Sequence, residues 1–209
     1  MSFPAIAQVD AYWEGLRAGR LMPARAEVDP RGMEAALEHA FILDYIGRGV
    51  GRLRIAGMHL NDLLGMEVRG MPLTSFFLPE ARERVAMVLE DVVTRPQVAD
   101  LSLVSPRGIG RPALAARMYL APLASIQGDM PRIIGCLQSL GGIGRAPRRF
   151  EIEKIQSRRI IATAPTRTEA REPQRGFAEA SGSFNRANAR ANGPSATPRP
   201  HLHLVSRDD

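Results

Sequence analysis

Apolar side chains recur at helical spacing near the start of the chain. Over residues 4–17, four of them follow one another at intervals of 3, 4 and 3 residues, which places them on one side of an α-helix. They are Ile6, Val9, Trp13 and Leu16. The pattern predicts an amphipathic helix that ends near Gly19, and its apolar stripe needs a cover. That cover is either the chain's own sheet or a second copy of the chain, with Trp13 as the anchor in both cases.

Two strands, several short helical segments and one longer helix are predicted in the middle of the chain. The first strand spans residues 40–46, and three closely spaced glycines allow a tight reversal into a second strand at 52–55. Asn61 is expected to cap a short turn that Gly65 ends. The longer helix begins at Pro79 and presents one apolar stripe. The stripe consists of Ala81, Val85, Val88, Leu89 and Val92.

Three more strands are predicted after the long helix. At 97–104 and 112–123 apolar and polar residues alternate, as they do in strands with one covered face. Residues 132–140 form a nearly continuous apolar run, which predicts a strand buried on both faces. Four apolar residues between 150 and 160 predict one further short element, either a helix or a strand.

The chain resembles a PAS domain in an ordered set of residues. PAS domains often read Asn, an apolar pair and Gly, then a second Gly, another apolar pair and a helix that starts with Pro-Glu. Here these places are held by Asn61, Leu63, Leu64, Gly65, Gly70, Phe76, Phe77, Pro79 and Glu80. The N-terminal residues are similar to the opening signature of small, stand-alone PAS proteins that are common in alphaproteobacteria. That signature is carried by Tyr12, Trp13, Glu14, Leu16, Arg17, Gly19, Arg20, Pro23, Arg25, Asp29 and Pro30.

The resemblance implies an α/β (α+β) fold, with a PAS-type five-stranded antiparallel sheet and short helices on one face. Together with the element pattern, it divides the chain into an N-terminal helix and connector at 1–29, a PAS-like domain at 30–141, a basic junction at 142–162 and a tail at 163–209. The tail has few large apolar residues and is predicted to be disordered. The resemblance also implies a sensory or protein-interaction module that no catalytic domain follows. It brings no established catalytic or ligand-contacting residues with it.

The composition favours a soluble, cytoplasmic protein. The 209 residues, 44% of them hydrophobic, are enough for one domain of ordinary size with a remainder. No apolar run approaches the roughly 18 residues that a membrane helix needs, and the first residues lack the pattern of a signal peptide. The single cysteine, Cys136, excludes an internal disulfide. We expect it to be a small core residue, with a redox-sensitive thiol as the alternative.

The net charge of +6 rests on arginine, because only one of the 28 basic residues is a lysine. The densest basic patch consists of Arg145, Arg148, Arg149, Arg158 and Arg159, near Lys154. We interpret this patch as a solvated junction. The alternative is a nucleic-acid-binding regulator that uses the Arg-rich junction and tail.

No motif for catalysis is present, and the chain is predicted not to be an enzyme. A nucleophile turn of the form GxSxG and the kinase motifs are both missing from the sequence. A haem or flavin sensor remains an alternative, although residues 80–93 contain no histidine for haem and the cysteine stretch of flavin photosensors is absent. His201 and His203 are too few for a metal site held by a fold, and His39 and His59 are expected at the surface. No metal or cofactor is therefore predicted.

A cavity between the sheet and the short helices is the remaining candidate site. Its expected lining is Leu64, Phe77, Val85, Leu89, Met118 and Leu120. These residues either fill the core or enclose an unknown small ligand. We therefore expect a non-enzymatic, cytoplasmic sensory or regulatory protein that acts through protein partners. One such contact is a homodimer formed through the N-terminal helix. Gating of the contact by a small ligand is left open.

Overall fold

The computed structural model describes residues 2–124 and 130–163. The helices are α1 (Pro4–Arg17), α2 (Met58–Leu64) and α3 (Pro79–Thr94), with short 3₁₀ segments η1 (Arg25–Glu27), η2 (Pro30–Ala36) and η3 (Leu73–Phe76). The strands are β1 (Ala40–Gly47), β2 (Val50–Ala56), β3 (Gln97–Ser105), β4 (Leu114–Leu123), β5 (Arg132–Leu140) and β6 (Glu151–Arg159). The tail predicted to be disordered lies outside the described residues, apart from Thr163.

Six strands form one antiparallel sheet in the order β2-β1-β5-β4-β3-β6. The α+β fold is confirmed, but the expected five strands are one too few. Part of the segment interpreted as a basic junction is β6, which pairs with β3 from Gln97↔Arg159 to Val104↔Glu151. The added strand takes up backbone groups of β3 that would otherwise form a free sheet edge.

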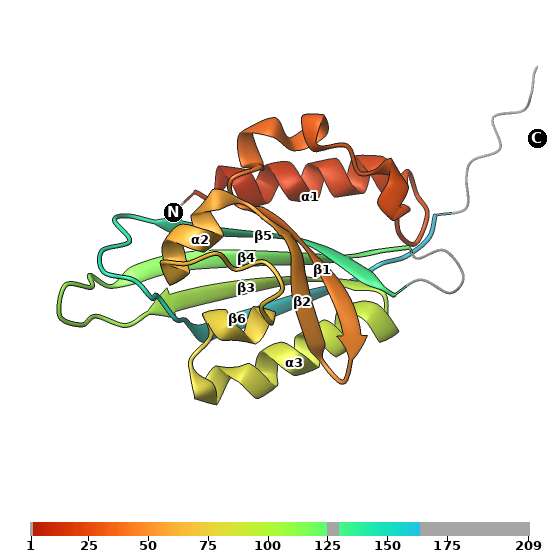
Figure 1. Cartoon of the computed structure of the whole chain (residues 1–209). Helices are drawn as coiled ribbons and strands as arrows, with labels where there is room; N and C mark the ends of the chain where they lie inside the picture. Colours follow the sequence, from red (N-terminus) through yellow and green to blue (C-terminus); the bar gives the residue numbers. More distant parts are fainter. Residues whose placement is uncertain (1, 125–129, 164–209) are drawn as a thin grey trace, which may run out of the picture. The chain divides into compact units, whose positions relative to one another are not determined.

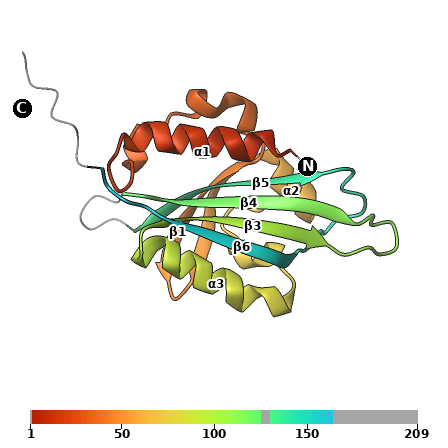
Figure 2. The same cartoon turned by 180° about the vertical axis from the view of Figure 1, so that it is seen from behind.

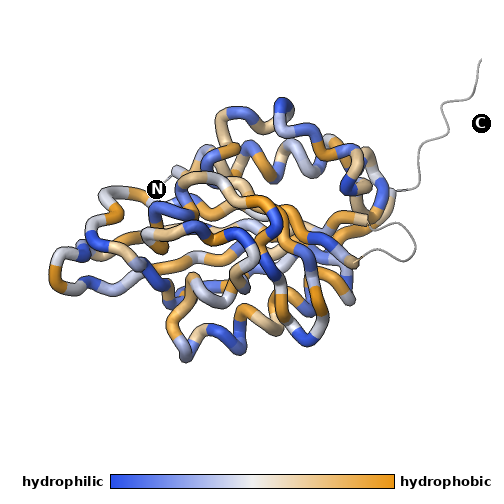
Figure 3. Tube along the Cα trace, viewed as in Figure 1, coloured by the Kyte–Doolittle hydropathy of each residue, from blue (hydrophilic) through white to orange (hydrophobic). Residues whose placement is uncertain are grey.

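One face of the sheet carries the larger hydrophobic core. Figure 1 and the reverse view in Figure 2 both show α3 on this face and α1 on the opposite one. The alternation in β4 explains the division, because Met118 and Leu120 belong to the core under α3 while Tyr119 and Ala121 belong to the core under α1. Figure 3 shows orange and blue segments alternating along the helices, as expected where one side of a helix is covered.

Two helix starts show how local chemistry sets the elements. Asp29 precedes η2, and its side chain accepts a hydrogen bond from the Arg31 amide at 3.0 Å, which caps the start of this segment. The cap expected at Asn61 is wrong, because α2 begins at Met58 after Gly57. The Asn61 side chain instead accepts from the Val68 amide at 3.1 Å, which holds the loop that follows the helix.

Candidate functional site

The six residues expected to line an inner cavity lie together on the α3 face of the sheet. All are buried members of one hydrophobic cluster to which every strand contributes: Leu64, Phe77, Val85, Leu89, Met118 and Leu120. These side chains carry no hydroxyl, amide, imidazole or charged group. A ligand between them would be held by shape and apolar contact alone.

The apolar stripe of α1 is covered by the opposite face of the same sheet. Ile6, Val9 and Trp13 are buried, and Leu16 is half-buried at the margin. The Trp13 indole N–H donates to the Pro122 carbonyl at 2.9 Å, so its one polar group is satisfied within the contact. Of the two covers that the sequence allows, this structure uses the chain's own sheet.

A cluster of charged side chains clamps α1 to β6. Arg158 on β6 donates to Glu14 at 2.6 Å and to Asp10 at 3.1 Å, and Arg17 donates to Glu14 at 2.6 Å. Partial burial raises the pKa of Glu14, but the hydrogen bonds from Arg158 and Arg17 outweigh it and hold this pKa below its usual range. The hydrogen bond to Glu14 raises the pKa of Arg158 in turn. Glu14 and Arg158 therefore stay ionised at neutral pH, and their ion pair joins the N-terminal helix to the last strand.

The arginines expected to form one basic patch do not lie together. Arg145 and Arg149 are exposed before β6, whereas Arg158 and Arg159 end that strand. Arg158 lies nine positions after Arg149 along a mostly extended chain, which corresponds to about 30 Å. Because Arg158 is also bound to two carboxylates, it does not present a free cation to a phosphate.

Arg148, the fifth member of that patch, is buried. Its guanidinium donates to the carbonyls of Pro112 at 2.6 Å and Ile143 at 2.8 Å, and to the Ser105 hydroxyl at 3.1 Å. Its backbone amide donates to the Leu63 carbonyl at 2.6 Å. Burial, together with nearby Arg111, lowers the pKa of Arg148. This residue connects the β3–β4 loop to the segment that leads into β6, and its interpretation as a surface residue is wrong.

Cys136 is a buried residue of the core under α1. Burial raises the pKa of its thiol to about 12, which keeps it protonated and unreactive at neutral pH. Within residues 2–124 and 130–163, no group of three or more potential metal ligands lies together. His201 and His203 lie outside these ranges.

His39 and His59 form a contact that the sequence did not reveal. Their rings meet edge to face with centroids 4.5 Å apart, and the Ser139 amide donates to Nε2 of His59 at 3.3 Å. Burial and then the neighbouring His39 lower the pKa of His59 to about 4. A ring that accepts from a backbone amide is neutral, so both observations describe an uncharged His59.

Sequence reasoning missed the clamp partners Asp10 and Glu14. Their spacing of four residues on a helix places both on one side of α1, which is a recognisable signal. Their partner Arg158 lies 144 residues after Glu14, and only the pairing of β6 with β3 brings it to the helix. Arg25, which borders a pocket described below, was also not predicted as a site residue.

None of the helices in the described part of the chain is long and apolar enough to cross a membrane. No curated protein matches the chain. Among solved structures, the chain is similar to the light-state structure of the LOV domain of the blue-light photoreceptor Aureochrome1, with 16% sequence identity and a TM-score of 0.39. That similarity covers 53% of this chain and 88% of the other.

The family comparison agrees with the resemblance seen in the sequence. The model of the PAS domain family matches residues 1–138, which are 138 of the 209 residues. The matched range includes α1, the helices on the α3 face and most of β5, so it spans both cores of the sheet. The chain belongs to the PAS domain family.

Proposed function

We propose that the chain is a non-enzymatic, cytoplasmic sensory or regulatory module that acts by contact with protein partners. Its membership of the PAS family supports a sensory role. The proposal rests on the way α1 is attached to the rest of the domain. Trp13 docks this helix on the outer face of the sheet, and Arg158 joins it to β6. A helix held in this way can be repositioned without disturbing the core under α3.

The end of α1 lies beside the segment that leaves β6. Arg17 donates to the Ile161 carbonyl at 3.4 Å, in addition to its contact with Glu14. A shift of α1 on the sheet therefore also moves the start of the segment beyond β6. A small apolar ligand within the hydrophobic cluster under α3 would act by favouring one of two positions of α1. To do so, it must bind the protein more tightly in one position of the helix than in the other.

The outward side of α1 offers a surface for a second helix. Three small residues at intervals of 4 are exposed there: Ala7, Ala11 and Gly15. Small side chains allow another helix to approach closely. We therefore place the protein contact, and the homodimer in particular, on this side of α1 instead of on the stripe that contains Trp13.

Native mass spectrometry of the full chain purified from its own host tests the proposal. We expect a second copy of the chain or a co-purifying protein bound to the wild type. The variant Ala11→Glu places a charged side chain on the outward side of α1 and should remove that bound protein. Glutamate is a good helix former, so the fold should be kept.

The matched control is Ala35→Glu, an exposed alanine on η2 outside the surface of α1. Its complex should remain at the wild-type level. A wild-type chain that carries no protein at all, or an Ala11→Glu variant that keeps its partner, would contradict the proposal.

A further inference from the structure

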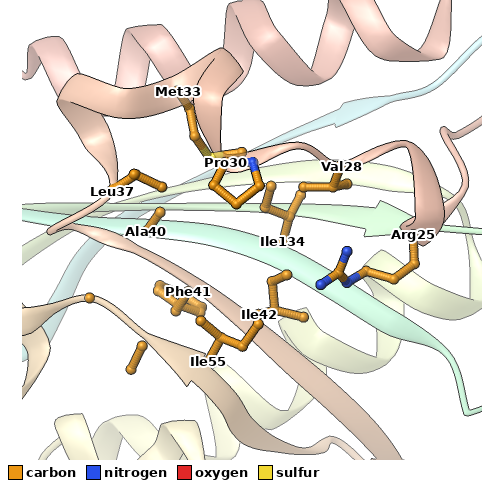
Figure 4. A pocket seen from close by; sticks show the side chains of 12 residues that line it. Arg25, Val28, Pro30, Met33, Leu37, Ala40, Phe41, Ile42, Ile55 and Ile134 are labelled. Carbon is orange, nitrogen blue, oxygen red and sulfur yellow. The ribbon is translucent and has the colours of Figure 1, made fainter.

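A pocket lies on the outer face of the sheet, and among its lining residues Phe41 also belongs to the hydrophobic cluster under α3. The segment that contains η1 and η2 forms its roof, and β1, β2 and β5 form its floor (Figure 4). Its volume is about 120 Å³. A cavity of roughly 150 Å³ lined by aliphatic and aromatic side chains accepts benzene, so this pocket has room for about one ring or a short alkyl chain.

The walls of the pocket are almost entirely apolar. Met33 contributes to the roof, and Ile42 and Ile134 contribute to the floor. At the rim, Leu37 is 39% exposed and Ile55 is 49% exposed. Covering these two side chains with an apolar group would remove hydrocarbon surface from water, at about 25 cal/mol for each Å².

One cation reaches into this apolar space. The guanidinium of Arg25 points into the gap between Ile42 and Ile134 (Figure 4). Among the described residues it has no hydrogen-bond or ion-pair partner, and its side chain is only partly exposed. A guanidinium has five donors, so an anion beside it would gain charge-assisted hydrogen bonds.

No carboxylate of the described residues lines the pocket, and the acidic residues closest in sequence to Arg25 and to Ile42 are bound to other groups. Glu27 binds Arg20 at 2.9 Å and the Ala24 amide at 2.6 Å. Asp44 on β1 binds Arg132 at 3.0 Å and Arg54 at 3.3 Å. The charge of Arg25 is therefore not neutralised by either of them.

We propose that this pocket binds a small free monocarboxylic acid with an apolar body, such as an aromatic acid or a short-chain fatty acid. The ring or chain lies between Met33, Ile42 and Ile134, and the carboxylate pairs with Arg25. A planar guanidinium matches a carboxylate through two parallel hydrogen bonds, which gives the pocket its preference for an acid over an alcohol or amide. This binding is a separate property of the outer face and does not depend on the proposed contact with protein partners.

Isothermal titration of the full-length protein with benzoate and hexanoate, against benzamide and hexanol as neutral controls, tests the proposal. We expect both acids to bind and their neutral counterparts to bind at least about tenfold more weakly, because a hydrogen bond to a charged group is lost. Arg25→Gln should weaken the acids about tenfold and leave the neutral compounds unchanged. Arg31→Gln removes the same charge from the exposed start of η2, outside the pocket, and should bind like the wild type.

A second variant tests the apolar part of the pocket without touching the charge. Ile55→Trp puts a bulky aromatic ring at the rim of the pocket. Ile55 lies on the edge strand β2, where an aromatic residue is tolerated. The variant should weaken the binding of benzoate and of hexanoate to the same extent. Failure of both acids to bind at millimolar concentration would overturn the proposal. Equal weakening by Arg25→Gln and Arg31→Gln would also overturn it, since net charge and not this pocket would then hold the acid.

Discussion

Arg148 and Arg149 are neighbours of the same residue type with opposite surroundings. Arg149 is exposed, whereas the guanidinium of Arg148 is enclosed by three carbonyls and the Ser105 hydroxyl. Within residues 2–124 and 130–163 its guanidinium donates to no carboxylate, so the cation is balanced by dipoles of neutral groups. Each of those acceptors would be left without this donor if the side chain were removed, and an unpaired buried acceptor costs about 1–3 kcal/mol.

Replacing Arg148 with methionine should lower the free energy of unfolding by about 2–4 kcal/mol, because the Pro112 and Ile143 carbonyls lose their donors. Urea unfolding followed by circular dichroism measures the change. Arg149→Met is the control and should stay within about 0.5 kcal/mol of the wild type. If the two variants were equally stable, the buried hydrogen bonds of Arg148 would not contribute to the fold.

At the scale of elements, β6 shows why the sequence left a choice between helix and strand. Ile152 and Ile155 are three residues apart, which does not fit the period of two in a regular strand. In the sheet, Ile155 pairs with Leu101 and Ile152 pairs with Leu103, so four residues of β6 oppose three of β3 across a bulge. The bulge brings both isoleucines to the α3 face, and it becomes visible only once the partner strand is known.

The contact between α1 and β6 is the element interaction most open to adjustment. Arg158→Gln removes its two ion pairs, which are partly exposed and together stabilise the whole fold by only about 1 kcal/mol or less. The local effect should be larger, because α1 can then open without global unfolding. We expect amide hydrogen exchange over residues 4–17 to become about threefold faster, measured by mass spectrometry.

The control for that exchange measurement is Arg159→Gln. Side chains alternate along a strand, so Arg159 points to the face opposite to Arg158 and away from α1. Its exchange over residues 4–17 should match the wild type. Unchanged exchange in Arg158→Gln would show that the clamp does not hold the helix.

For the whole molecule, His59 links stability to pH. Its pKa is about 4 in the folded chain, whereas an unperturbed histidine has a pKa of 6.5. The pKa is lowered because burial and the neighbouring His39 disfavour the charged form. Between pH 4 and pH 6.5, His59 is mostly protonated in the unfolded chain and mostly neutral in the folded chain. The contribution of His59 is therefore fully present above pH 6.5, decreases as the pH falls toward 4 and is lost below it.

Urea unfolding at pH 7, 6, 5 and 4.5 measures this dependence. The wild type should lose about 1–2 kcal/mol more than His59→Gln over that range, a value reduced for the partial exposure of the ring. Glutamine keeps an acceptor for the Ser139 amide but does not titrate, so the difference between the two proteins isolates His59. Parallel curves for the two proteins would contradict the assignment.

The sequence by itself determined the N-terminal helix, the long helix, β5 as a strand buried on both faces, and the family. Each of these depends on local periodicity or on an ordered set of residues, which a linear pattern contains. Tertiary structure alone decided that β6 joins the sheet, that Arg148 is buried while Arg149 is not, and that Arg25 faces an apolar pocket. These outcomes depend on pairings between residues that are far apart in the chain, such as Ser105 with Arg148 and Glu14 with Arg158. Hydrophobic periodicity reports which side of an element is covered, but not which distant element covers it.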